Sequence, residues 1–132
     1  KAGDFDTAIT TLEFSGGRMA VIKNSRRAAY GYDQRIEFLG SDGLLAAHNV
    51  LENTVEIITR AGATKAKPEH FFLERYAKAY QIEWNSFIEG VEGDTELPVT
   101  LQDGINALIV AEAAALSARE GRTVDVANEI PA

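Results

Sequence analysis

Cysteine is absent from the 132-residue sequence. Disulfide bridges, thiolate nucleophiles and cysteine-ligated metal centres all require that side chain, so the sequence excludes these three kinds of site. A chain of this length is nevertheless long enough to bury a hydrophobic core. Its fold must therefore rest on packing and hydrogen bonding rather than on covalent cross-links.

Long apolar runs are also absent, and methionine nearly so. No stretch approaches the roughly 20 consecutive apolar residues that a membrane-spanning helix needs, which argues against a function within a bilayer. The one methionine is Met19, so the sequence does not begin at its own initiator. We therefore expect that Lys1 is a cut inside a longer protein and that an N-terminal half is missing.

Positive charge is in short supply. Lysine and arginine together number 13 against 20 aspartates and glutamates, which gives a formal net charge of −7. Proteins that bind nucleic acids or anionic membranes present a basic face to the phosphates. The sequence therefore argues against both kinds of partner.

The first sixty residues alternate in the manner of β-strands. Ser-Gly-Gly at 15–17 and Gly-Ser-Asp-Gly at 40–43 are strong turn signals between runs rich in β-branched and aromatic residues. Strands are expected over 5–14, 18–25, 32–39, 44–48 and 54–60. Successive strands joined by tight turns predict an antiparallel meander.

Helical spacing follows the strands. From 69 to 91, apolar residues recur every three or four positions, after Pro68, which suits the first position of a helix. A second helix is expected over 100–120. Thr100 has the character of its N-cap, and Asp103 stands where a capping box needs an acceptor.

Strands first and helices second predict one α+β domain over residues 1–132. We expect a mostly antiparallel, open-faced sheet of about five to six strands, with two long helices packed on one face. Gly121 should end the second helix, and 123–126 is expected as a last strand. Apolar residues at neighbouring strand positions cannot all face the helices, so the other sheet face is expected to mediate self-association.

No catalytic or metal-binding constellation is apparent. His48 and His70 stand alone, without a second ligand at metal spacing. The pair Gly16-Gly17 is not followed by a helical pattern, so it predicts a hairpin turn rather than a phosphate-binding loop. We therefore expect no metal site.

Tyrosine is the residue type whose placement points to binding. Tyr30 and Tyr32 flank Gly31, a residue that can bend or bulge a strand, and Tyr76 and Tyr80 are four apart on one helix face. Tyrosine rings pack on the C–H faces of polyhydroxylated ligands, and phenols hydrogen-bond their hydroxyls. The same residues also suit aromatic core positions, and the residues alone leave both interpretations open.

Several motifs occur in an order that resembles one enzyme family. They are Tyr-Gly-Tyr-Asp-Gln-Arg at 30–35, Phe-Leu-Gly-Ser-Asp-Gly at 38–43, Phe-Phe-Leu-Glu-Arg-Tyr at 71–76 followed by Tyr80, and Pro-Val-Thr-Leu-Gln-Asp-Gly at 98–104. Together they resemble the C-terminal domain of the glucose–fructose oxidoreductase, inositol dehydrogenase and rhizopine catabolism family. Within it, the likeness is greatest to the bacterial inositol 2-dehydrogenases, and it covers about residues 4–126.

The resemblance implies an activity of which this chain holds only a part. Enzymes of this family have an N-terminal Rossmann domain that binds NAD or NADP. Its dinucleotide fingerprint, the lysine of its Glu-Lys-Pro motif and the family's Asp-x-x-x-His pair are absent from this sequence. Those groups take up the proton as hydride leaves for the nicotinamide. The full-length enzyme is expected to oxidise a secondary hydroxyl of myo-inositol, or of a related sugar, to a ketone. This chain is expected to bind no cofactor, to hold no catalytic residue and to be inactive by itself.

The resemblance also suggests substrate contacts and partners. Tyr32 and Tyr80 match two tyrosines that line the inositol pocket in the resembled enzymes, while Tyr30 and Tyr76 are weaker candidates and Tyr76 better suits the core. The open sheet face is implied to form a homo-oligomer, a dimer or a tetramer, and a cytoplasmic location is expected. The alternative is a non-enzymatic module that dimerises through its sheet or binds a sugar. A G-x-G-x-x-G unit followed by Glu-Lys-Pro upstream of this sequence would favour the enzyme, and its absence would favour the alternative.

Overall fold

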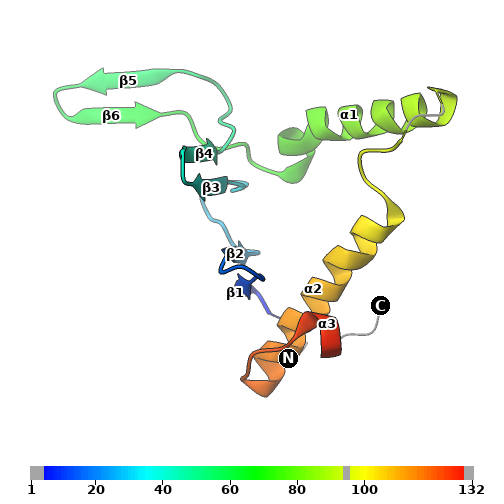
Figure 1. Ribbon diagram of the computed structural model, residues 1–132. Coiled ribbons are helices and arrows are strands. Elements are labelled where there is room, and N and C mark those ends of the chain that lie inside the picture. Colours follow the sequence, from blue (N-terminus) through cyan, green and yellow to red (C-terminus); the bar gives the residue numbers. More distant parts are fainter. Residues whose placement is uncertain (1–4, 94–95, 130–132) are drawn as a thin grey trace. The chain divides into compact units, whose positions relative to one another are not determined.

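The structure is a computed structural model that describes residues 5–93 and 96–129. It separates into two compact units, Lys1–Ile82 and Glu83–Ala132. The first unit contains six strands in three hairpins and the first half of α1 (Phe72–Gly93) (Figure 1). The second contains the rest of α1, α2 (Leu101–Glu120) and α3 (Val126–Glu129).

The first hairpin forms where the sequence predicts it. Strands β1 (Thr7–Glu13) and β2 (Met19–Ser25) pair antiparallel, with Thr7 opposite Ser25 and Glu13 opposite Met19. Gly16 and Gly17 both have positive φ, as the tight turn requires, and the Phe14 N–H donates to the Arg18 carbonyl at 2.9 Å. The turn signal is therefore confirmed.

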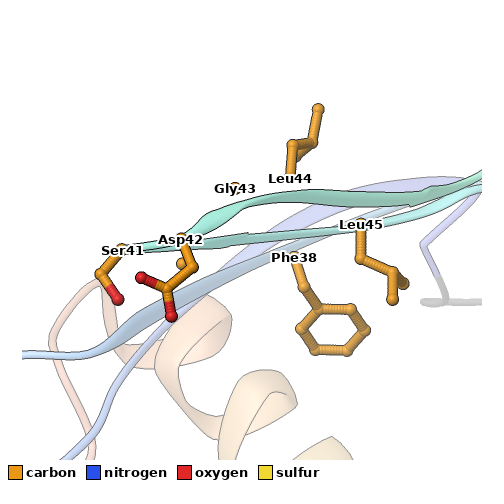
Figure 2. Close-up of a pocket in the computed structure, with 7 residues that line it drawn as sticks. Phe38, Ser41, Asp42, Gly43, Leu44 and Leu45 are labelled. Atoms are coloured by element: carbon orange, nitrogen blue, oxygen red, sulfur yellow. The ribbon is translucent and has the colours of Figure 1, made fainter.

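The second hairpin is apolar on both faces. Strands β3 (Ile36–Gly40) and β4 (Gly43–Ala47) pair across a two-residue turn. Phe38 opposes Leu45 on one face and Leu39 opposes Leu44 on the other; Figure 2 shows Phe38 and Leu45 on the side opposite to Leu44. All four side chains are exposed, and Leu39 most of all at 87%. Neither face of this hairpin has the polar character of a solvent face.

The strand predicted over 32–39 begins later in the structure than expected. Residues 32–35 have no regular structure, and β3 begins at Ile36. The backbone bends at Gly31, which has a φ of 127°, and the loop that follows takes its hydrogen bonds from side chains and from another segment. A side-chain period of two cannot reveal such a loop when its residues happen to alternate.

The third hairpin contains a strand that the sequence pattern does not predict. Strand β5 (Glu56–Thr59) falls within the predicted run, but its partner β6 (Gly62–Lys65) lies where we expected a connection. The β6 sequence Gly-Ala-Thr-Lys has one β-branched residue and no aromatic one. Its strand conformation therefore comes from pairing with β5 rather than from its own propensity.

The single sheet of five to six strands is a wrong prediction. The six strands form three separate two-stranded sheets, β1–β2, β3–β4 and β5–β6. Each hairpin is specified locally by its turn, whereas pairing between hairpins depends on contacts between residues far apart in the chain. Local patterns carry no signal for that second step. The α+β class and the antiparallel pairing are confirmed, and the covering of one face by the two helices stays a prediction.

Helix α1 begins at Phe72, four positions after the predicted start at Pro68. Pro68 instead forms an antiparallel bridge with Leu51. The Glu52 N–H donates to the Lys67 carbonyl at 2.9 Å, and the Glu69 N–H donates to the Val50 carbonyl at 3.1 Å. The hydrogen bonds around this bridge do not need an N–H group from Pro68, so proline fits the bridge as well as it fits a helix start. The bridge ties residues 50–52 to the segment that leads into α1.

Helix α2 carries the predicted caps. The Asp103 N–H donates to Thr100 Oγ1 at 3.3 Å, and the Thr100 N–H donates to the Asp103 carboxylate at 2.8 Å, which completes the capping box. Gly121 ends the helix in the left-handed conformation, with its N–H on the Ser117 carbonyl. Both ends of this helix were therefore predicted correctly.

Replacing Thr100 by alanine should lower the free energy of unfolding by about 1 kcal/mol, because the first turn of α2 loses a side-chain acceptor. Chemical denaturation of the protein measures the change. Thr123→Ala, a threonine beyond the cap at Gly121, is the control and should leave stability within about 0.5 kcal/mol of the wild type. Equal stabilities for both variants would contradict the capping role.

The predicted last strand over 123–126 is wrong, because α3 begins at Val126. The Asp125 carboxylate accepts the Ala127 N–H at 3.1 Å and caps this short helix. Arg122 pairs with Glu120 at 2.7 Å and with Glu129 at 2.5 Å. The guanidinium and the Asp125 N–H lower the pKa of Glu129 to about 2, so the pairs persist well below neutral pH. These local polar contacts outweigh the weak strand propensity of Thr-Val-Asp-Val.

Most of the large apolar side chains in the described residues are exposed to solvent. Within 5–93 and 96–129, Ala113 in the alanine-rich part of α2 is the one residue classed as buried, at 5% exposure. Apolar side chains of all three hairpins, such as Ile9, Leu39 and Ile58, are exposed. Over the same residues, no helix is both long enough and apolar enough to cross a bilayer.

Candidate functional site

The candidate site begins at Gly31, in the loop between β2 and β3. A Cβ atom at this position would lie 2.9 Å from the Glu69 carbonyl oxygen and 3.1 Å from the Pro68 carbonyl oxygen. The first distance is shorter than Cβ contacts in proteins reach, the second is tighter than most of them, and the positive φ is itself unfavourable for other residues. Glycine therefore allows the loop to lie directly on the backbone that leads into α1.

This close approach fixes Tyr32. Its N–H donates to the Glu69 carbonyl at 2.7 Å, and its ring meets Tyr76 edge to face, with the centroids 5.4 Å apart and the planes at 79°. Tyr76 in turn meets Tyr80 at 6.1 Å and 68°. Such edge-to-face contacts are favourable between aromatic rings. We call the three residues Tyr32, Tyr76 and Tyr80 the tyrosine surface.

The tyrosine surface presents neutral hydrogen-bonding groups. Tyr80 is 49% exposed, while Tyr32 and Tyr76 are half-buried. Burial, and then the neighbouring Tyr32 phenol, raises the pKa of Tyr76, so its hydroxyl stays protonated at physiological pH. The Arg75 guanidinium lies 5.5 Å from the centre of the Tyr76 ring. A row of rings that carries neutral phenols suits an uncharged ligand with both C–H faces and hydroxyls.

Tyr30 is engaged differently from the other three tyrosines. Its hydroxyl donates a hydrogen bond to the Asp33 carboxylate, which raises the pKa of Tyr30. Among the described residues, no ring contact joins it to the tyrosine surface. Its phenol can still accept a hydrogen bond, but its proton is already used.

Asp33 gathers the polar groups of this loop. Arg35 donates to both carboxylate oxygens, from Nε at 2.8 Å and from Nη2 at 2.8 Å. The Arg35 guanidinium, and then the Tyr30 hydroxyl, lower the pKa of Asp33. We call Tyr30, Asp33 and Arg35 the Asp33 cluster. Just beyond it, the Gln34 N–H donates to Asn49 Oδ1 at 2.8 Å.

The structure brings three of the four predicted tyrosines together and sets the fourth in the Asp33 cluster. The spacing of four residues on a helix predicts the contact between Tyr76 and Tyr80. No local pattern in the sequence predicts the contact between Tyr32 and Tyr76. The close approach of Gly31 and the hydrogen bonds of Asp33 were also missed. A glycine between two tyrosines marks the first place in the sequence, and an arginine two residues after an aspartate marks the second, but neither pattern specifies the contact.

No metal centre emerges from the part of the chain that the structure describes. Over residues 5–93 and 96–129, no group of three or more histidines, aspartates and glutamates has a geometry that holds a metal ion. His48 follows β4, and His70 precedes α1. The two histidines lie in different loops of the described residues, and they do not form part of a common metal site.

Two features that could suggest a phosphate site, the Gly16-Gly17 pair and the start of α2, lack the form of a dinucleotide-binding loop. Gly16 and Gly17 form a turn between two strands, not a loop that opens a helix. The N–H groups at the start of α2 are capped by Thr100, beside the negative charge of Asp103, which would repel a pyrophosphate. No step of a reaction can therefore be assigned to a nicotinamide on these residues.

The family model and the similar proteins all point to one family of oxidoreductases. Residues 1–126 match the family model described as an oxidoreductase family, C-terminal alpha/beta domain. The chain is 47% identical over 124 residues to an uncharacterized oxidoreductase of Bacillus subtilis, which covers 94% of the chain and 36% of that protein. It is 44% identical over 126 residues to the inositol 2-dehydrogenase of Rhizobium meliloti, with 96% and 38% covered. It is 45% identical over 130 residues to the myo-inositol 2-dehydrogenase of Thermotoga maritima, with 98% and 39% covered.

Solved structures agree with the sequence comparison. A myo-inositol dehydrogenase from Corynebacterium glutamicum matches with a TM-score of 0.84 and 42% identity, over 98% of this chain and 38% of that one. A scyllo-inositol dehydrogenase from Lactobacillus casei, solved with NAD(H) and scyllo-inositol bound, matches with a TM-score of 0.86 and 26% identity, over 96% and 37%. The chain thus spans between 36% and 39% of the length of the three curated relatives.

Proposed function

The chain belongs to that oxidoreductase family as its C-terminal alpha/beta domain, and on this premise we propose that it is the substrate-binding part of an NAD- or NADP-dependent inositol 2-dehydrogenase. In full length, the enzyme would oxidise a secondary hydroxyl of myo-inositol, or of a related sugar, to a ketone. The proton-transfer groups and the cofactor site would come from an N-terminal Rossmann domain outside this chain. The single domain over 1–132 and the cytoplasmic location of the enzyme stay predictions.

The tyrosine surface is the observation that carries this proposal. An inositol is uncharged and has a hydroxyl on every ring carbon, so it needs flat apolar walls and neutral hydrogen-bonding groups rather than ions. Tyr32, Tyr76 and Tyr80 supply rings and phenols of this kind in contact with one another. The chain's net charge of −7 would disfavour an anionic substrate.

We assign the direct polyol contacts to Tyr32 and Tyr80. Tyr80 has the more exposed ring, and Tyr32 is held in a fixed position by Glu69. Tyr76 lies between them and spaces their rings, with its phenol as a secondary contact. Tyr30 is the weakest of the four candidates, because its hydroxyl proton already serves Asp33.

An activity assay of the full-length protein tests this function directly. We expect the protein to reduce NAD+ or NADP+ when myo-inositol is added, as followed by absorbance of the reduced nicotinamide. Parallel assays with scyllo-inositol and glucose would rank the substrates, and the 1–132 chain by itself is the control that should show no turnover. A full-length protein without a G-x-G-x-x-G unit upstream, and without activity on any of the three, would refute the proposal.

We further propose that the enzyme is a homo-oligomer joined through the exposed apolar side chains of its β3–β4 hairpin. The apolar side chains on both faces of β3–β4 support this, because exposed apolar surface of this extent favours burial against a partner (Figure 2). A second copy of the chain is the partner that a symmetric interface needs.

Analytical ultracentrifugation at micromolar concentration should find the full-length protein as a dimer or a larger assembly. Leu39→Lys should shift it towards the monomer, because a charge would replace the most exposed apolar side chain of β3. Ser41→Lys in the turn of the same hairpin is the matched control and should leave the assembly intact. A wild type that sediments purely as a monomer would contradict the proposed interface.

A further inference from the structure

The loop that carries Tyr32 is anchored on both sides of this residue. On one side, Gly31 lies against the backbone of Pro68 and Glu69, and the Tyr32 N–H is bonded to the Glu69 carbonyl at 2.7 Å. On the other side, the next residue is Asp33, and the Gln34 N–H is bonded to Asn49. Residues 32–35 lie in no strand or helix, so these contacts take the place of a ladder.

The Asp33 carboxylate is the most heavily used acceptor of this loop. It receives the Tyr30 hydroxyl from before Tyr32 and two N–H groups of Arg35 from after it. Its side chain is only 15% exposed, whereas Arg35 is more than half exposed. One largely buried carboxylate therefore joins the residues on either side of Tyr32. A paired arginine and carboxylate with two parallel hydrogen bonds fixes direction as well as distance.

We propose that Asp33 is a positioning residue for the polyol: it clamps the loop from Tyr30 to Arg35 so that the Tyr32 hydroxyl and ring stand in register with Tyr76 and Tyr80. This inference rests on the proposed function. It gives the Asp33 cluster a role in substrate affinity that acts entirely through Tyr32. Tyr30 then belongs to the clamp rather than to the substrate wall.

A carboxylate next to a substrate tyrosine would otherwise suggest a general base. Here both oxygens of Asp33 already accept hydrogen bonds, and two of these bonds come from a cation. A carboxylate in this setting resists protonation, whereas a general base must take up a proton near neutral pH. The geometry thus favours positioning over proton transfer.

A double-mutant cycle on the full-length enzyme tests the clamp. Asp33→Asn and Tyr32→Phe are each expected to raise KM for myo-inositol by about twofold to tenfold, the range of one hydrogen bond. In the Tyr32→Phe background, Asp33→Asn should add less than about twofold, because the hydroxyl that forms the hydrogen bond to the polyol is already gone and only the ring remains to be positioned. KM for the nicotinamide cofactor, kcat and the pH profile of kcat should stay at wild-type values.

Asp42→Asn is the matched control, because Asp42 is an exposed aspartate in the β3–β4 turn. This variant should change neither KM for myo-inositol, nor KM for the cofactor, nor kcat and its pH profile.

The possible results separate the two proposals. If Tyr32→Phe raises KM but Asp33→Asn does not, or if the two effects simply multiply, the clamp is overturned and the proposed function stands. If Asp33→Asn lowers kcat a hundredfold and removes a limb of the pH profile, Asp33 is a base and the clamp is wrong. If Tyr32→Phe itself has no effect, the assignment of Tyr32 to the pocket fails, and the clamp fails with it. Should Asp33→Asn not fold, Tyr30→Phe, which removes one donor from the same carboxylate, takes its place in the cycle with the same expected pattern.

Discussion

Replacing Gly31 by alanine should destabilise the full-length protein more than the loss of the Thr100 cap does. The φ of 127° costs a non-glycine residue about 1–3 kcal/mol. The new methyl group would also stand 2.9 Å from the Glu69 carbonyl oxygen, so the loop must move away from the segment that leads into α1. That movement breaks the hydrogen bond from Tyr32 to Glu69, worth about 0.5–1.5 kcal/mol.

Gly62 offers a closely matched control for this prediction. It has a similar φ of 135° in the β5–β6 turn, but a Cβ atom there would meet no atom within 4 Å. Gly62→Ala therefore imposes the backbone strain without the collision. Denaturant titration of both variants should find Gly31→Ala less stable than Gly62→Ala by about 1 kcal/mol or more. Equal losses of stability would contradict the close contact between the Tyr32 loop and the start of α1.

Removing the hydroxyls of Tyr32 and Tyr80 should weaken substrate binding without disturbing the cofactor. Each of Tyr32→Phe and Tyr80→Phe keeps the ring and its edge-to-face contacts but removes one phenol. The loss of a hydrogen bond to a neutral hydroxyl costs about 0.5–1.5 kcal/mol, which corresponds to about a twofold to tenfold rise in KM for myo-inositol. Steady-state kinetics of the full-length enzyme measures KM for both substrates.

The cofactor provides the internal control for the tyrosine variants. KM for NAD+ or NADP+ should remain within about twofold of the wild type, because the proposed cofactor site lies in an N-terminal Rossmann domain outside this chain. A rise in both Michaelis constants together would point to a general loss of structure. Unchanged kinetics for myo-inositol in both variants would refute the assignment of these tyrosines to the substrate pocket.

Local chemistry explains which parts of the fold could be predicted from the sequence. The turn at Gly16-Gly17 and the capping box of Thr100 and Asp103 each depend on residues within four positions of one another. Both signals were therefore complete in the sequence. The alternation of apolar residues likewise sufficed to place five of the six strands, though not their ends.

Contacts between distant segments explain what was missed. The late start of α1 follows from the bridge between Leu51 and Pro68, which lie far apart in the chain. The expected single sheet failed for the same reason, since no local signal specifies which hairpin edge meets which. Strand β6 was missed for a different reason, because its own residues have little strand propensity and its conformation comes from pairing with the neighbouring β5. Local propensity is a weak guide wherever tertiary contacts decide the outcome.

The candidate site divides in the same way. Tyr76 and Tyr80 could be paired from their spacing on a helix, and the resemblance to a known family supplied the functional weight of Tyr32. The sequence could not reveal that Gly31 lies against Glu69, or that Asp33 joins Tyr30 to Arg35, because each contact depends on how an irregular loop folds. An irregular loop has no period from which a side-chain direction could be inferred.

The affinity of the full-length enzyme for myo-inositol tests the central claim most directly. Isothermal titration calorimetry, with the reduced nicotinamide cofactor present at saturation, would compare the wild type with the double variant Tyr32→Phe and Tyr80→Phe. If the tyrosine surface is the wall of the substrate site, the double variant should bind myo-inositol at least about fivefold more weakly than the wild type. Equal dissociation constants for myo-inositol in the two proteins would contradict the account.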